Sequence, residues 1–146
     1  MKRFPLLIVF CTALLCAAPA CADVFIVVAD ASPLQVITTK ALQALYMGRT
    51  RTADSGEVAQ VYDLPRENDL RDMFYQSLTG MSPAQINSYW SRLIFTGQTL
   101  PPLVLPNEQA VQETLKRNIN GIGYLSREPK GTGLRTLLVL RSAPAG

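Results

Sequence analysis

The stretch that decides the fold is Val24-Phe25-Ile26-Val27-Val28-Ala29, a continuous run of apolar residues that are mostly β-branched or aromatic. Such a run predicts a strand that is buried on both faces, as happens in sheets that helices cover on each side. The segment 30–33, which contains serine and proline, ends the run. The sequence therefore predicts an α/β domain with its core between a sheet and its helices.

The rest of the chain alternates between helical and strand patterns. Helices are predicted to begin after the capping residues Thr38, Asn68, Ser82 and Asn107. Further strands are predicted at 58–62, 121–125 and 134–140. Apolar helical stripes place Leu45, Phe74 and Trp90 in one core. This alternation predicts one domain over residues 23–146, with a mostly parallel or mixed sheet and helices on its faces.

Residues 1–22 have the organisation of a cleaved secretory signal peptide. Lys2 and Arg3 precede an apolar run over 6–18, and Ala20-Cys21-Ala22 forms a small-x-small cleavage site before Asp23. The run is shorter than the roughly 20 residues that span a bilayer. We expect a periplasmic protein without a membrane span after cleavage. The alternatives are an uncleaved membrane anchor and a lipoprotein modified at Cys21.

Composition narrows the function classes. All three cysteines lie before residue 23, so the processed chain is expected to have no disulfide. Without Lys2 and Arg3 the chain has twelve basic and eleven acidic side chains, a balance that predicts no nucleic-acid surface. It contains no histidine, which argues against zinc, haem and Ser-His-Asp chemistry. We predict no cofactor, no metal and no enzymatic activity, since no nucleophile is paired with a base.

Three segments, in this order, resemble the periplasmic phosphate-binding proteins of ABC transporters. They are Ala44–Arg49, Tyr89–Gly97 with Pro101-Pro102, and Asn120–Leu125. The resemblance is greatest to the short, single-domain bacterial relatives of these proteins, and it covers most of residues 24–126. It implies one lobe of a type II periplasmic-binding-protein fold that binds a small oxyanion such as phosphate. It also implies an ABC transporter permease or another periplasmic protein as partner.

The resemblance implies where the anion contacts lie. The family holds phosphate at a helix start, where amides point outward and the helix dipole is positive. In this chain the corresponding segment is 64–70, with Asn68 at the family's serine position. Arg66 and Arg71 flank that helix start and are predicted to add charge-assisted hydrogen bonds. Ser32, in the loop after the first strand, corresponds to a further contact.

Each of these assignments has an alternative. Glu67, Asp69 and Asp72 share the same turn and would repel a divalent anion, so a merely capped helix start is one alternative. For Ser32 the alternative is an ordinary turn residue. For the whole protein the alternative is an interaction module that kept the fold and lost the ligand, with the proline-flanked segment 95–106 as its docking surface.

Overall fold

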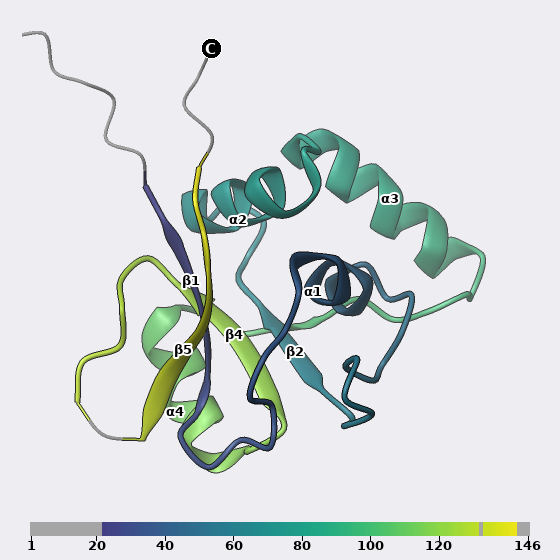
Figure 1. The fold of residues 1–146 in the computed structure, drawn as a ribbon. Coiled ribbons are helices and arrows are strands. Elements are labelled where there is room, and N and C mark those ends of the chain that lie inside the picture. Colours follow the sequence, from purple (N-terminus) through teal and green to yellow (C-terminus); the bar gives the residue numbers. More distant parts are fainter. Residues whose placement is uncertain (1–21, 132, 143–146) are drawn as a thin grey trace, which may run out of the picture.

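A computed structural model of the chain describes residues 22–131 and 133–142. Each helix that the sequence predicts is present after its predicted cap. Of the predicted signal peptide, residues 1–21 lie outside the described residues, so its cleavage stays a prediction. In chain order the elements are β1 (Val24–Ala29), α1 (Thr39–Tyr46), β2 (Gln60–Asp63), α2 (Asp69–Thr79), α3 (Pro83–Phe95), β3 (Leu103–Val104), α4 (Glu108–Arg117), β4 (Gly121–Leu125) and β5 (Leu134–Leu140) (Figure 1).

The five strands form one sheet in the order β3-β2-β4-β1-β5. Strand β2 runs parallel to β3 and β4, whereas β1 runs antiparallel to β4 and β5. The sheet is therefore mixed, which is one of the two forms that the sequence left open. Because parallel strands end at the same edge, β2, β3 and β4 have their carboxyl ends together, and β1 ends at the opposite edge.

Helices cover both faces of this sheet, as the apolar β1 pattern predicts. Gly123 of β4 faces α4 so closely that an added Cβ would lie 2.5 Å from Val111 Cγ1. Successive strand residues point to opposite faces, so Tyr124 points the other way and its ring stacks on Phe74 of α2, with centroids 4.0 Å apart. Helices α4 and α2 thus cover opposite faces of the sheet (Figure 1). Strand β1 is buried along most of its length.

The predicted core is confirmed. Leu45, Phe74 and Trp90 belong to one cluster of buried residues, in which Phe74 is 0% exposed and Trp90 is 3% exposed. Tyr46 of α1 meets the Phe74 ring edge-on, with centroids 4.6 Å apart. Of the two aromatic residues Tyr89 and Trp90 on α3, Trp90 is part of the core and Tyr89 is only partly buried.

Gly48 fixes how α1 ends against the loop that follows α3. Its backbone has a φ of +68°, which favours glycine. An added Cβ would lie 2.9 Å from Thr99 Cγ2 and 3.0 Å from the Trp90 ring. The close approach and the left-handed backbone together require glycine at this position.

Two details differ from the sequence prediction. The strand predicted at 58–62 begins later, at Gln60, because Val58 forms an isolated antiparallel bridge with Thr52 instead. The sequence does not predict strand β3, because its two exposed residues lie between prolines and show no alternation. It forms through parallel pairing with β2, a contact between segments about forty residues apart.

Candidate functional site

The end of β2 carries a buried carboxylate, Asp63, that accepts four hydrogen bonds. One oxygen accepts from the Leu64 amide at 2.8 Å and from the Tyr124 hydroxyl. The other accepts from Arg71 Nε at 3.1 Å and from the Tyr75 hydroxyl at 2.9 Å. Asp63 is therefore tied to β4 and α2 at once, and this network fixes the start of α2 relative to the sheet.

The tyrosines around Asp63 are kept neutral. Burial raises the pKa of Tyr75 and of Tyr124 above the ordinary value, and the nearby Asp63 charge raises both further. Tyr46 has its pKa raised by the same two causes, and its hydroxyl donates to the backbone carbonyls of Tyr62 and Ile122. These hydroxyls act as hydrogen-bond donors inside the domain and do not face solvent.

Arg71, predicted from the sequence as an anion contact, points into the domain. Its side chain is 6% exposed, pairs with Asp63, and lies 4.9 Å from the centroid of the Tyr75 ring. Burial alone would lower the pKa of Arg71, but the charge of Asp63 and the hydrogen bond to it outweigh that effect, and the pKa is raised. The Arg71 charge is therefore compensated inside the protein, so Arg71 positions the helix start.

Asn68 and Arg66 lie together at the start of α2. Asn68 is the N-cap, as predicted, and its side-chain oxygen accepts from the Leu70 amide at 2.9 Å. Arg66 is exposed in the turn just before the cap, beside the exposed Glu67 and near the exposed Asp69. The helix start thus presents the exposed Arg66 cation together with the exposed carboxylates of Glu67 and Asp69, a mixed electrostatic environment.

The structure does not bring Ser32 to the other three predicted residues. Ser32 follows the carboxyl end of β1, which lies at the opposite edge of the sheet from the start of α2 (Figure 1). The residue is buried, its hydroxyl accepts from the Leu34 amide at 3.3 Å, and its carbonyl accepts from Arg135. In this structure Ser32 shapes the turn between β1 and α1.

A second polar cluster, which the sequence did not single out, follows β4 at the same edge as the start of α2. Both carboxylate oxygens of Glu108, in the first turn of α4, accept from Ser126, one of them from its amide at 2.8 Å. Arg127 and Lys130 line the adjoining pocket of about 290 Å³. Because Glu108 and Ser126 are eighteen positions apart, no local sequence pattern predicts this contact.

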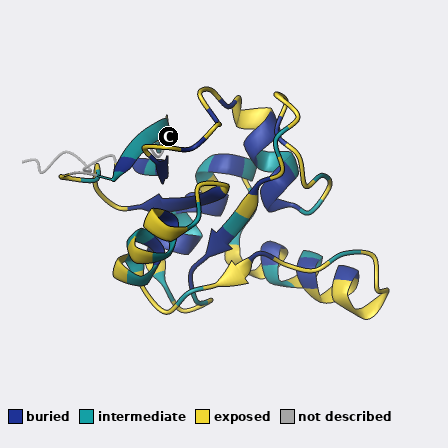
Figure 2. Ribbon diagram, turned by 90° about the horizontal axis from the view of Figure 1, so that it is seen from below, coloured by how far each residue is buried: buried dark blue, intermediate teal, exposed yellow. Residues whose placement is uncertain are grey.

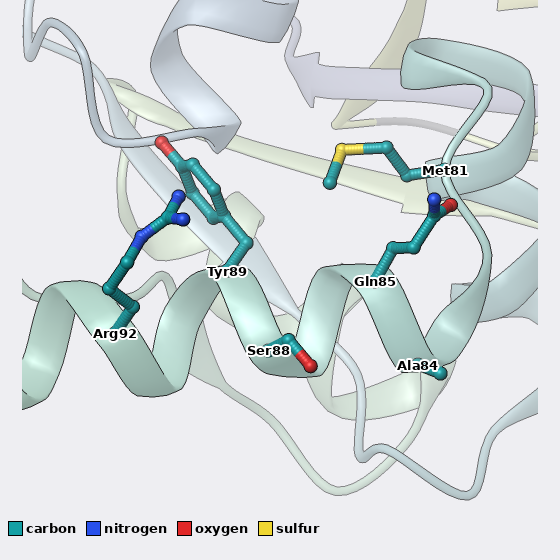
Figure 3. A pocket seen from close by; sticks show the side chains of 6 residues that line it. All are labelled: Met81, Ala84, Gln85, Ser88, Tyr89 and Arg92. Atoms are coloured by element: carbon teal, nitrogen blue, oxygen red, sulfur yellow. The ribbon is translucent and has the colours of Figure 1, made fainter.

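A pocket of about 350 Å³ lies on α3, away from the start of α2. Its lining residues are Met81, Ala84, Gln85, Ser88, Tyr89 and Arg92 (Figure 3). The Tyr89 hydroxyl donates to the Met47 carbonyl at 2.6 Å, and the Arg92 guanidinium lies 5.9 Å from the Tyr89 ring centroid. Since Met81 follows the last turn of α2, this pocket lies a helix length from the predicted anion contacts.

A larger groove of about 540 Å³ runs between the end of α1, β2 and the segment before β3. Its lining residues include the apolar Val58, Leu100 and Leu103, and Arg51 is the charged residue of the lining.

Across residues 22–131 and 133–142, no three histidine, cysteine or acidic side chains gather as a metal site. Within the same residues no helix combines the length and apolar character needed to cross a membrane.

Comparison with known proteins gives matches at the level of structure. No protein-family model matches the chain, and no curated protein sequence matches it. An ABC-type phosphate transport receptor from Vibrio cholerae is similar with a TM-score of 0.52 and 16% identity, over 71% of this chain and 41% of the receptor. A second similar structure is that of a protein from Clostridium perfringens, described as a phosphate ABC transporter substrate-binding protein with bound phosphate. Its TM-score is 0.60 and its sequence identity is 13%, over 80% of this chain and 45% of that protein.

The chain thus spans less than half the length of either solved structure. At these identities the likeness concerns the fold. It agrees with the mixed five-stranded sheet and the helices on both of its faces. The chain has the fold of a single lobe of the substrate-binding proteins of phosphate ABC transporters.

Proposed function

We propose that this chain is an exported solute-binding domain that contacts a small oxyanion, such as phosphate, at the start of α2. One observation carries the proposal: the start of α2 lies at the edge where the parallel strands β2, β3 and β4 end. Ligands of open α/β sheets bind outside the carboxyl ends of such strands. A binding role is supported further by the fold that the chain shares with phosphate-binding proteins.

Three residues have distinct roles in this proposal. Arg66 is exposed and supplies the charge-assisted hydrogen bonds to the anion. Asn68 caps the helix and keeps its first amides in place. Arg71, held by Asp63, sets the orientation of the helix. The natural partner would be an ABC transporter permease or another periplasmic protein.

Phosphate binding is expected to be weak and to depend on Arg66. One lobe leaves the anion open to water, so we expect dissociation constants from high micromolar to millimolar, or about 4–6 kcal/mol. Arg66→Ala should weaken binding about tenfold, since it removes a charged hydrogen bond. Added salt should weaken it as well, because an exposed site is screened. Isothermal titration calorimetry with phosphate and with sulfate measures the dissociation constant, its change in Arg66→Ala and its dependence on salt.

Arg117→Ala is the matched control for this titration. Arg117 is an exposed arginine in the last turn of α4, next to the amino end of β4 and thus at the opposite edge of the sheet. The substitution removes the same charge and should leave the anion affinity unchanged. Equal losses in the two variants would indicate a general charge effect and contradict a site at α2. The absence of heat with either anion at millimolar concentration would remove the binding proposal.

Export is tested by the mass of the mature chain. Signal peptidase should cleave between Ala22 and Asp23, and the protein should appear in the periplasmic fraction with Asp23 as its first residue. Mass spectrometry of that fraction gives the answer directly. A chain that keeps Cys11 and Cys16, or that carries lipid on Cys21, would contradict the proposed cleavage.

An interaction module is the second candidate, and two observations favour it. The Arg71 charge is neutralised by Asp63 within the domain. Several large apolar side chains between Ile94 and Val104 are exposed. A protein that lost its ligand but kept the fold would show both features. In that case the calorimetric titration would give no heat, while the apolar surface would still bind a partner.

A further inference from the structure

The end of α3 and strand β3 present an apolar surface to solvent. Six side chains on it, here called the α3–β3 surface, are between 47% and 92% exposed: Val58, Ile94, Phe95, Leu100, Leu103 and Val104. Figure 2 shows β3 and the last turn of α3 in the colour of exposed residues. Together these side chains expose on the order of 600 Å², at the upper end of the largest apolar patches found on monomers. A patch of this size marks a contact surface.

The α3–β3 surface combines a projecting side chain with a hollow. Phe95, at the tip of α3, is 92% exposed. The groove of about 540 Å³ is lined by Val58, Leu100 and Leu103 from the same surface. Buried aromatic side chains that fill apolar pockets dominate the affinity of protein interfaces. Polar residues, among them Arg51 and Asn118, also line the groove, so the surface carries a projecting aromatic ring and a partly apolar hollow.

Strand β3 lies at the edge of the sheet and is limited on both sides by proline. It pairs with β2 along one side only. Pro101-Pro102 and Pro106 flank it and cannot donate backbone hydrogen bonds. Open-ended strand addition is blocked in this way, which is how natural proteins protect an edge. A partner must therefore be held mainly by side chains.

We propose that a second copy of this chain docks on the α3–β3 surface about a two-fold axis, so that Phe95 of each copy enters the groove of the other. A two-fold contact uses the same surface twice, and this surface supplies both projection and groove. Two such patches bury roughly 1,200 Å², the size at which specific interfaces begin. None of the six side chains is charged, and Arg51 is the one charged residue that lines the groove.

Sedimentation equilibrium of the purified chain, from low to several hundred micromolar, tests the proposal. The average mass should rise towards that of a dimer. Phe95→Ala and Leu103→Glu should each weaken self-association at least about tenfold. Val36→Glu is the matched control, since Val36 is 76% exposed and lies outside the surface. That variant should dimerise like the parent chain, and circular dichroism should show that all variants are folded.

Two outcomes would overturn the proposal. If the chain stays monomeric at every concentration tested, it does not form this dimer, and the α3–β3 surface would then bind a different protein. A dimer that survives both Phe95→Ala and Leu103→Glu uses another surface. Neither outcome bears on phosphate binding, because the α2 start and the α3–β3 surface are tested by separate variants.

Discussion

Asp63→Asn is expected to lower the free energy of unfolding by about 3–5 kcal/mol, the typical cost of breaking a buried ion pair. Asparagine keeps the shape but removes the charge that compensates Arg71, whose side chain is 6% exposed. Its amide also brings donors to a position where the Tyr75 and Tyr124 hydroxyls, the Leu64 amide and Arg71 all donate. Chemical denaturation of the variant and the parent chain measures the difference.

Asp69→Asn is the control for this experiment. Asp69 is the first residue of α2 and is exposed, so its carboxylate contributes to stability mainly through the helix dipole. Such an interaction is worth about 0.3–1 kcal/mol. If Asp63→Asn cost no more than Asp69→Asn, the buried network would not stabilise the domain, and the assignment of Arg71 as a positioning residue would fail.

Phe74→Ala is expected to destabilise the domain by about 3–5 kcal/mol. Phe74 is fully buried, stacks on Tyr124 at 4.0 Å, and meets Tyr46 and Tyr75 edge-on at 4.6 and 5.0 Å between centroids. Removing its ring leaves a cavity where α1, α2 and β4 meet. The midpoint of denaturant unfolding, with the slope checked for two-state behaviour, gives the size of the effect.

Phe95→Ala makes the same chemical change at an exposed position. Phe95 is 92% exposed, and exposed substitutions usually change stability by less than about 0.5 kcal/mol. The two variants should be compared at a low protein concentration, where the proposed dimer contributes least. Similar losses in both would mean that the burial of Phe74 is not what stabilises the core.

The helices of this domain could be predicted locally. Thr38, Asn68, Ser82 and Asn107 each cap the helix that the sequence assigns to them, because a cap acts on amides only two or three residues away. The apolar stripes also predicted the burial of Leu45, Phe74 and Trp90. Periodicity and caps depend on neighbours in the sequence, so these features need no tertiary information.

The candidate site could be predicted only in part. Asn68 was identified as a helix cap, and the structure agrees. The sequence predicts Arg71 as a ligand contact because it flanks the helix start, and the structure pairs it with Asp63, eight residues earlier on a strand. The resemblance groups Ser32 with these residues, but the antiparallel direction of β1 places it at the other edge of the sheet. Strand direction is a long-range property that no local pattern reveals.

By itself the sequence determined the α/β class, the positions of the helices and the apolar character of β1, because each follows from local periodicity and capping. Only the tertiary structure decided the strand order, the buried Asp63 network and the exposure of the α3–β3 surface. The physical reason is that a charge or an apolar side chain is buried or exposed according to what packs against it. Arg71 is buried because Asp63, at the end of the preceding strand, pairs with it, whereas Phe95 remains 92% exposed within the part of the chain that the structure describes.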